Sequence, residues 1–330
     1  MQFSELGDTG IKVSKIAFGC MSTVANPTYD GLEDQEGIAT IRAALDHGIN
    51  FFDTAPAYGN GASEDLLGRA LEGVRDKVVI ADKISSQVMS AEEVVAECEK
   101  SLKLLRTDYI DLYQVHWPRR QVPLEETLHA MDRLLKQGKV RSLGVCNFGI
   151  ADISEALGTD VPLVTNQISY SLLARAAEIE VQEPCDRAGI GFLCYSPLAQ
   201  GLLAGTYASA DDVPPERART RMFSKDRPQS RHDEAGCEDE VFAAIAEIRE
   251  ISQRVGHSMA NVSLAWLLQN DSVTSVLVGA SRPDQVARNA AAADVHLTRD
   301  VIDELDAATH AVKSAMGSSL DMWATPPRTR

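Results

Sequence analysis

Residues 134–145 read Leu-Leu-Lys-Gln-Gly-Lys-Val-Arg-Ser-Leu-Gly-Val, and this stretch predicts the fold. The end of an amphipathic helix runs into Gly138, a residue suited to a helix C-terminus. A short loop then leads to an apolar run that begins near Val140. Such near-continuous apolarity is typical of a strand covered on both faces. The stretch is therefore one helix-to-strand step of a β/α repeat.

The same step recurs along the chain. Eight buried strands are predicted at Ile16–Cys20, Asn50–Thr54, Val78–Lys83, Tyr109–His116, Val140–Asn147, Leu163–Ile168, Gly191–Ser196 and Val273–Gly279. Amphipathic helices are expected between them, for example at Gln35–His47, Glu64–Leu71, Ala91–Leu105, Leu124–Gln137 and Val286–Ala293. Eight strand–helix units favour an α/β fold of the (β/α)8 TIM-barrel type over an open sheet. We expect residues 1–330 to form one such domain.

Three segments depart from the repeat. Leu6–Gly10 and Ile11–Val13 indicate an N-terminal hairpin. Residues 205–239, after the seventh strand, are rich in Pro, Arg, Asp and Ser, and a loop of that length is usually functional or mobile. Its arginine-rich part, Arg217–Arg231, could cover a bound cofactor as a lid or be disordered. Further helices are expected at Glu240–Val255, Met259–Gln269 and Asp300–Thr309, before a polar tail.

The composition excludes several classes of protein. The chain has 330 residues, 44% hydrophobic and 24% charged, which suits a globular domain with a substantial core. A formal net charge of −16 disfavours a nucleic acid or an anionic membrane as partner. No apolar run approaches the roughly 18 residues of a spanning helix, and the N-terminus lacks an export signal. Six cysteines without a Cys-x-x-Cys pair and seven histidines without zinc-like spacing predict a cytoplasmic protein with reduced thiols and no metal.

Four polar residues fall at the ends of three consecutive predicted strands. Asp53 ends the second strand and Tyr58 follows it, Lys83 ends the third, and His116 ends the fourth. In a parallel barrel the carboxyl ends of all strands meet at one mouth, where catalysis takes place. We therefore expect these four side chains, which are distant in sequence, to be neighbours.

The four groups suit one proton-transfer reaction. Tyrosine is a weak acid, with an ordinary pKa of about 10. A neighbouring ammonium such as Lys83 stabilises the phenolate, and a carboxylate such as Asp53 can hold that ammonium in place. A ring N–H of His116 could orient a carbonyl oxygen beside the Tyr58 hydroxyl. Each residue also has a structural explanation (a strand end, a turn, a solvent-directed lysine, a core histidine), but their shared position favours catalysis.

These motifs together resemble the aldo-keto reductase superfamily. The resemblance rests on Phe51-Phe-Asp-Thr-Ala-Pro-Ala-Tyr-Gly59, Gln114-Val-His-Trp-Pro118, Gly144-Val-Cys-Asn-Phe148 and Tyr195-Ser-Pro-Leu-Ala-Gln-Gly-Leu-Leu203. It is strongest with the bacterial aldose-reductase-like and the potassium-channel β-subunit-like branches. It implies an NADPH-dependent oxidoreductase that reversibly reduces an aldehyde or ketone to an alcohol. Tyr58 is then the general acid or base, Lys83 lowers its pKa, Asp53 anchors Lys83, and His116 positions the carbonyl. The alternative is a cofactor-sensing regulatory subunit of the same fold with little turnover.

The resemblance also implies how the cofactor binds. No Gly-x-Gly-x-x-Gly follows a strand, so a Rossmann site is not expected. Instead, an extended dinucleotide crosses the barrel mouth. Its carboxamide is held by Asn147, Asn166 and Gln167, Tyr195 stacks on the nicotinamide, and the pyrophosphate lies along Ser196, Leu198, Gln200 and Gly201. A barrel lyase or hydrolase would leave these motifs without a purpose.

The adenosine end of the cofactor is expected where the last strand leads into a helix. A helix start offers free N–H groups and a favourable dipole to phosphate. Arg282 can grip a 2′-phosphate through its fork of donors, so NADPH is favoured over NADH. The expected contacts are Gly279, Ser281, Arg282, Gln285 and Asn289.

Two positions depart from the family pattern. Asp82 stands where relatives often carry threonine, and strand alternation predicts that it faces the helices. Cys146 replaces the usual serine near the nicotinamide amide, where Asn147 can compensate.

The substrate is expected to be a small carbonyl or alcohol compound, with Met21 and Trp117 at its pocket. Arg119 and Arg120 follow Trp117, and they either attract an anionic substrate or are solvated loop residues. The sequence predicts neither the natural substrate nor the oligomeric state.

Overall fold

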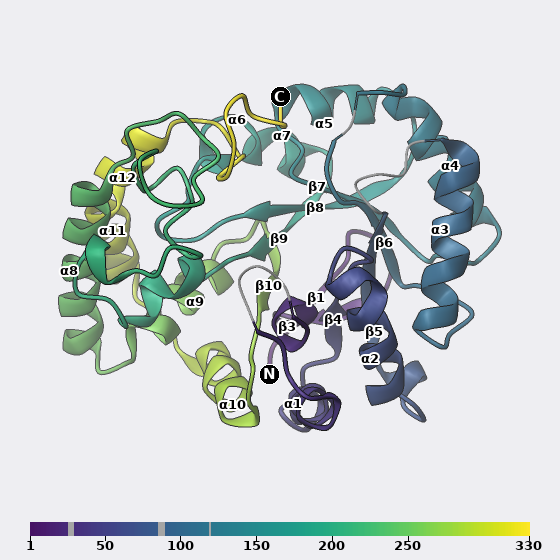
Figure 1. Ribbon diagram of the computed structural model, residues 1–330, viewed down its shortest axis with the longest axis horizontal. Helices are drawn as coiled ribbons and strands as arrows, with labels where there is room; N and C mark the ends of the chain where they lie inside the picture. Colours follow the sequence, from purple (N-terminus) through teal and green to yellow (C-terminus); the bar gives the residue numbers. More distant parts are fainter. Residues whose placement is uncertain (26–29, 85–89, 119) are drawn as a thin grey trace.

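The computed structural model describes residues 1–25, 30–84, 90–118 and 120–330, and in these residues eight parallel strands close into a barrel (Figure 1). Around the barrel the order is β10-β3-β4-β5-β6-β7-β8-β9, so strands that follow one another in sequence are neighbours. The predicted (β/α)8 barrel is confirmed. Its strands are β3 (Ile16–Gly19), β4 (Phe51–Asp53), β5 (Val79–Ile84), β6 (Leu112–Val115), β7 (Leu143–Cys146), β8 (Leu163–Ser169), β9 (Gly191–Tyr195) and β10 (Val273–Val278).

Two strands start three residues later than the sequence predicted, because the pairing is interrupted after an isolated Ile110–Val140 bridge, where side chains take part in the hydrogen bonds. β6 starts at Leu112 and β7 at Leu143. Just before them, Asp111 Oδ2 accepts the Ile80 N–H at 3.0 Å, and the Ser142 hydroxyl donates to the Asp111 carbonyl at 2.6 Å. The polar residues inside these apolar runs thus mark the N-terminal end of the barrel.

The N-terminal hairpin closes that end of the barrel. It consists of β1 (Phe3–Glu5) and β2 (Lys12–Ser14), paired antiparallel. Leu6 and Val13 of the hairpin are fully buried and belong to the same apolar cluster as Phe51, Leu112 and Leu193 of the barrel strands. Because this end is filled, a ligand can approach the barrel interior only from the carboxyl ends of the strands.

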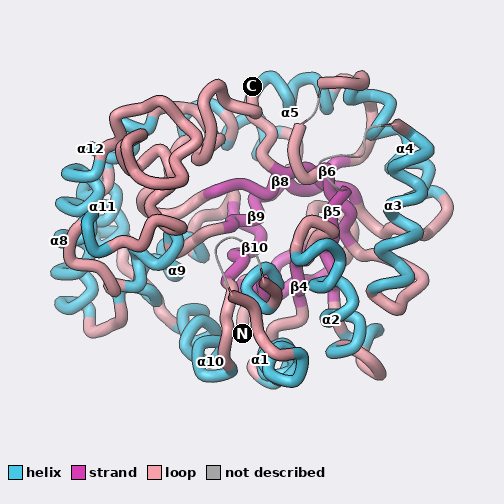
Figure 2. Tube along the Cα trace, viewed as in Figure 1, coloured by secondary structure: helices cyan, strands magenta, loops and turns pink. Residues whose placement is uncertain are grey.

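Helices surround the strands, as Figure 2 shows. The core consists of two apolar clusters. The smaller one is the cluster inside the barrel that includes Leu6 and Val13. The larger one lies between the barrel and these helices. The other predicted helices are found within two residues of their expected bounds, but α10 is shifted by three residues at both ends, to Pro283–Ala290 from Val286–Ala293, and a helix that was not predicted, α12, follows α11. The helices are α1 (Asp34–Asp46), α2 (Ala62–Ala70), α3 (Ala91–Leu104), α4 (Leu124–Lys136), α5 (Ile150–Leu157), α6 (Ala177–Glu180), α7 (Gln182–Arg187), α8 (Glu238–Val255), α9 (Met259–Leu268), α10 (Pro283–Ala290), α11 (Arg299–Ala308) and α12 (His310–Met316).

The long loop between β9 and α8 packs against the C-terminal tail, and Figure 1 shows the two segments together, in green and yellow. Arg221 ties them: its main-chain N–H donates to the Met322 carbonyl at 2.9 Å, and its guanidinium donates to the Met316 carbonyl at 3.0 Å. The same guanidinium bonds Glu234 at 2.6 Å, within the loop. Phe223, at the centre of the loop, is 1% exposed. The loop is therefore packed and not disordered, and its role as a lid over the cofactor stays a prediction.

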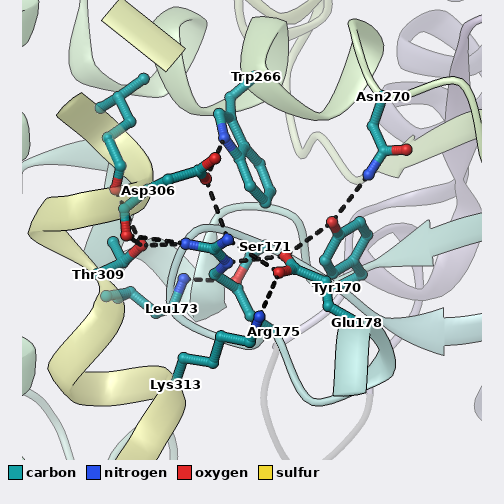
Figure 3. Close-up of polar contacts among 11 residues, drawn as sticks. Tyr170, Ser171, Leu173, Arg175, Glu178, Trp266, Asn270, Asp306, Thr309 and Lys313 are labelled. Carbon is teal, nitrogen blue, oxygen red and sulfur yellow. Dashed lines mark hydrogen bonds and ion pairs between the residues drawn. The ribbon is translucent and has the colours of Figure 1, made fainter. Parts of the chain in front are cut away.

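A buried polar cluster joins the turn after β8 to the last helices (Figure 3). Arg175 binds Glu178 with two hydrogen bonds, of 2.7 and 2.8 Å, and reaches Thr309 at 2.9 Å. Lys313 of α12 binds Glu178 from the other side at 2.7 Å. Burial alone would raise the pKa of Glu178, but the hydrogen bonds from the two cations lower it below its ordinary value. The cluster fastens α11 and α12 to the barrel.

In the described parts of the chain, no helix is both long and apolar enough to span a membrane. All six cysteines fall in these parts, where they are buried and form no disulfide.

Candidate active site

A fully buried ammonium lies at the centre of the barrel mouth. Lys83, on β5, has three donors, and each has an acceptor. Its Nζ lies 2.6 Å from Asp53 Oδ1, 2.8 Å from the Thr54 carbonyl and 3.3 Å from the Tyr58 hydroxyl. The side chain of Lys83 is 0% exposed, so the ion pair with Asp53 is shielded from water. The side chains of Asp53, Tyr58 and Lys83 thus lie together, as the sequence predicted.

The electrostatics of the site keep two protons in place. Burial alone would lower the pKa of Lys83, but the charges of Asp53 and Tyr58 raise it above its ordinary value. Burial raises the pKa of Tyr58 to about 12, and the charge of Lys83 opposes this rise. At neutral pH the site therefore holds a charged ammonium beside a neutral phenol.

The loop after β4 brings the Tyr58 hydroxyl to the ammonium. The Ser63 N–H donates to the Tyr58 carbonyl at 3.2 Å, and the hydroxyls of Thr54 and Ser63 are 2.9 Å apart. Gly59 and Gly61 have φ angles of +62° and +92° in the turn between. A side chain at Gly59 would also crowd its neighbours, since a Cβ there would lie 3.1 Å from the Cβ of Ala62. The glycines thus allow a tight turn directly into α2.

His116 completes the predicted group of four. It follows β6, and its ring stands edge-on to the Tyr58 ring, with centroids 6.0 Å apart and planes at 86°. Its carbonyl accepts a hydrogen bond from Asn147 Nδ2 at 3.1 Å, which links the loops after β6 and β7. The His116 ring therefore lies against the Tyr58 ring at the barrel mouth.

Gln167 has a contact that the sequence did not suggest. Its Nε2 donates to Asp53 Oδ2 at 2.7 Å, so both oxygens of the Asp53 carboxylate are bound. Gln167 is on β8 and Asp53 on β4, across the barrel mouth. The sequence indicates only that Gln167 is a polar residue near the end of a strand. It does not indicate which residue Gln167 contacts.

The three residues expected at a carboxamide differ in orientation. Asn147 Oδ1 accepts the Tyr195 hydroxyl at 2.8 Å, which fixes that ring at the mouth. Asn166 points elsewhere: it is 0% exposed, and its amide binds the main-chain N and O of Phe148 at 3.3 and 2.9 Å. Asn166 therefore holds the loop after β7, whereas the Asn147 amide, which is also bonded at both ends, joins the Tyr195 hydroxyl to the His116 carbonyl. Cys146 is buried next to this loop.

The turn after β9 has a series of left-handed residues. Ser196, Gln200 and Gly201 have φ angles of +51°, +55° and +98°. Gln200 Oε1 is buried without a hydrogen-bond partner among the described residues, and Arg217 of the long loop lies so close that a Cβ on Gly201 would be 3.2 Å from its Nη1. Leu198 precedes the turn and accepts the Gly201 N–H at 2.9 Å. Ser196, Gln200 and Arg217 line a recess of about 320 Å³, a volume that includes space open to solvent, together with Ser169, Ser171, Met322 and Trp323.

The start of α10 is the other expected binding segment. Arg282 is the N-cap residue, with an extended backbone, and its exposed side chain pairs with Asp284 at 3.1 Å. Gln285 Oε1 accepts the main-chain N–H of Ser281 at 2.7 Å, and Asn289 Nδ2 donates to the Gly279 carbonyl at 3.3 Å. The segment is thus held in a fixed turn. A Cβ on Gly279 would lie 3.0 Å from Ser22 Oγ, so the backbone passes close to the turn after β3.

The expected substrate wall is only partly described. Trp117 is covered by the guanidinium of Arg328, 3.5 Å from the ring centroid, and Arg328 pairs with buried Asp321 at 2.7 Å. The tail therefore reaches the residue next to His116. Met21 lies in the turn after β3, at the same end of the barrel.

Arg120 is exposed, as one of the two expectations had it, but its guanidinium is paired within the chain. Two of its nitrogens bind Asp152 Oδ1 at 2.9 Å, and Asp152 is 1% exposed. Asp152 also accepts the main-chain N–H of Arg330 at 2.7 Å. Arg120 thus helps to hold the tail on α5. Arg119 lies outside the described residues.

Known proteins similar to this chain indicate one family. The model of the aldo/keto reductase family matches residues 15–310. The chain is 34% identical to the aldo-keto reductase YhdN of Bacillus subtilis over 87% of both chains. It is 31% identical to a probable voltage-gated potassium channel subunit beta of Arabidopsis thaliana, over 93% of this chain and 96% of that one. The crystal structure of an aldo/keto reductase from Klebsiella pneumoniae in complex with NADP and acetate superposes with a TM-score of 0.76, at 27% identity, over 98% of this chain and all of that one. The chain belongs to the aldo/keto reductase family.

Proposed function

We propose that this protein is an NADP(H)-dependent oxidoreductase that interconverts an aldehyde or ketone and the corresponding alcohol. The observation that carries the proposal is the Tyr58 hydroxyl, 3.3 Å from an ammonium that Asp53 holds in a water-excluded site. Family membership supports the oxidoreductase class, and the Klebsiella pneumoniae relative was crystallised with NADP.

The residues present fit a dinucleotide with phosphate groups. Gln200 has a buried oxygen that no described residue pairs, and Arg217 supplies a cation beside the left-handed turn at Gly201, where any side chain would intrude. At α10 the two cations Arg282 and Arg288 share one carboxylate, Asp284, so a positive charge remains for a 2′-phosphate. When bound, NADPH supplies a hydride to the carbonyl carbon.

The chain's own residues then handle the proton. Tyr58 donates its hydroxyl proton to the carbonyl oxygen, because its raised pKa keeps the phenol protonated at neutral pH. Lys83 stabilises the phenolate that forms, and its position is fixed by Asp53 and, through Asp53, by Gln167. His116 faces the same oxygen and orients it. In the oxidation direction the phenolate accepts the proton back.

We assign the remaining residues by their contacts. Asn147 and Gln167 are proposed to bind the nicotinamide carboxamide, and Tyr195 to stack on its ring. Asn166 is instead proposed to position the loop after β7, because both of its amide bonds are to the main chain of that loop, whereas those of Asn147 are to Tyr195 and His116 at the mouth. Ser196, Leu198, Gln200, Gly201 and Arg217 are proposed to lie along the pyrophosphate, and Gly279, Ser281, Arg282, Gln285 and Asn289 around the adenosine.

A second candidate function is favoured by the similarity to probable potassium channel β-subunits. A regulatory subunit of this kind would oxidise bound NADPH once and then stop. Both candidates are tested by mixing the protein with excess NADPH and a panel of sugars, α-dicarbonyls and aromatic aldehydes, while the loss of NADPH absorbance is followed. Many turnovers per chain support the enzyme, one equivalent supports the sensor, and no oxidation with any carbonyl contradicts both.

A further inference from the structure

Behind the proposed active site, a group of polar side chains is buried between the barrel and two helices. Asp82 is on β5, Tyr113 on β6, Glu64 on α2 and Ser101 on α3. Their exposed fractions are 0%, 0%, 0% and 1%. Asp82 immediately precedes Lys83, and because side chains alternate along a strand, it points to the helices while Lys83 points to the mouth. None of these four side chains has a role in the proposed reaction.

Most of the polar atoms in the group have no hydrogen-bond partner among the described residues. Both carboxyl oxygens of Glu64, Oδ2 of Asp82, and the hydroxyls of Ser101 and Tyr113 are buried and unpaired there. The remaining oxygen, Asp82 Oδ1, accepts the main-chain N–H of Lys83 at 2.8 Å. Leaving so many buried polar atoms unpaired would cost several times about 1–3 kcal/mol. A hydrogen bond among these side chains is therefore strongly favoured.

The two carboxyl groups are close enough to control each other's ionisation. Burial raises the pKa of both Asp82 and Glu64, and the charge of each acts on the other. Ser101 faces both of them and lowers both pKa values, as a donor would. The other charges that face the group are Lys83 from β5 and Glu97 and Lys100 from α3, and Cys98 of α3 lies beside Tyr113. No cation of the described residues bonds to either carboxyl side chain directly.

Two buried carboxylates without a bonded cation do not both ionise, because each destabilises the charge of the other. One proton between them gives a hydrogen bond between a carboxyl and a carboxylate, which is short and strong. We propose that Glu64 and Asp82 share a proton at neutral pH, and that this hydrogen bond fastens α2 to β5 and so positions Tyr58 against Lys83.

Glu64 and Asp82 are connected to the site through adjacent residues and their hydrogen bonds. Glu64 follows Ser63, whose main-chain N–H binds the Tyr58 carbonyl and whose hydroxyl binds Thr54. Asp82 is bonded to the main chain of Lys83. Movement of α2 away from β5 would therefore lengthen the 3.3 Å contact between Lys83 and Tyr58. Glu64 and Asp82 are positioning residues, and this last step rests on the proposed function, whereas the shared proton does not.

The shared proton is tested by infrared difference spectroscopy of the full chain. We expect the wild-type protein to show the C=O band of a protonated carboxylic acid at neutral pH. Glu64→Gln and Asp82→Asn should each remove it, because an amide donor lets the remaining acid ionise. Glu178→Gln is the matched control, since Glu178 is a partly buried acid held ionised by Arg175 and Lys313, and the band should persist in that variant. Absence of the band in the wild type, or its survival in either of the first two variants, would overturn the proposal.

The positioning role is tested by comparing two substitutions at one site. Glu64→Leu removes the hydrogen bond, and kcat for carbonyl reduction should fall on the order of tenfold with little change in the KM for NADPH. Glu64→Gln, which keeps a hydrogen bond to Asp82, should restore most of kcat. If Glu64→Leu folds and turns over like the wild type, the positioning role is wrong. If the wild type itself has no turnover, the proposed function fails, and the infrared experiment still decides whether the proton is shared.

Discussion

Substitution of Asp53 by asparagine removes one charge from a buried ion pair and keeps the shape of the side chain. Asp53 and Lys83 are 3% and 0% exposed, and the atoms that join them are 2.6 Å apart. Loss of one partner from a buried pair typically costs about 3–5 kcal/mol, because the other charge stays buried without compensation. We expect a loss of this size in the free energy of unfolding at neutral pH, measured by urea denaturation.

The pH dependence of this loss has a definite sign. In the wild type the pKa of Lys83 is raised above its ordinary value. The ion pair therefore contributes its full stability below the ordinary lysine pKa, and this contribution is lost as the pH rises through the folded-state value. In Asp53→Asn the main cause of the raised pKa is gone while burial, which lowers it, remains. The variant should thus gain stability, relative to wild type, as the pH rises toward the ordinary lysine value.

A matched control separates stability from chemistry. Asp111 is also buried and ion-paired, with Arg75 at 2.7 Å and Arg141 at 3.2 Å, but it lies at the closed end of the barrel. Asp111→Asn should lower stability to a similar extent and leave kcat near the wild-type value, whereas Asp53→Asn should lower kcat strongly. Equal activities in the two variants would refute the assignment of Asp53 to the site.

Three further outcomes are expected. Because the pKa of Tyr58 is raised to about 12, the rate of carbonyl reduction should stay constant through neutral pH and decline only in strongly alkaline buffer, as a pH–rate profile will show; a decline near neutrality would contradict this. In fluorescence titrations, Arg282→Ala should weaken the binding of NADPH by about 1–2 kcal/mol, roughly tenfold, and the binding of NADH hardly at all. Equal losses of affinity for the two cofactors would contradict a role of Arg282 at the 2′-phosphate. Gln167→Leu leaves Asp53 Oδ2 without its donor, so it should cost about 1–3 kcal/mol in urea denaturation, and a neutral result would show that the 2.7 Å contact is dispensable.

The sequence predicted those features that follow from strand order. Eight apolar runs define the barrel, and the carboxyl end of each strand must reach the same mouth, so the order of the strands is enough to place Asp53, Lys83 and His116 together. The Tyr58 loop follows from its position directly after β4. These inferences need only topology, which the periodic pattern of apolar residues determines.

Contacts between distant, irregular segments could not be predicted in this way. Arg120 was expected to be either solvated or available to an anion; its side chain is exposed, but its guanidinium is ion-paired with the buried carboxylate of Asp152. The pairing joins positions that no periodicity relates. Asn166 likewise has a polar side chain at a strand end, and only the path of the next loop shows that its amide serves Phe148.

Glu64 shows the same difficulty within a helix. In the sequence it is an acidic residue in the first turn of a helix, where acids are common and usually exposed. In the structure it is fully buried, because α2 packs between α1 and α3. Burial of a single helix position depends on how the helix is rotated, and a short helix pattern does not fix this rotation to one residue.

Tyr58→Phe tests the central claim most directly, because it removes one oxygen atom and leaves the packing of the ring. Single-turnover oxidation of bound NADPH by a reactive aldehyde should be about 10²–10⁴ times slower in the variant than in the wild type, while fluorescence titration shows unchanged NADPH affinity. A variant that oxidises NADPH at a rate close to the wild type would contradict the assignment of Tyr58 as the proton donor.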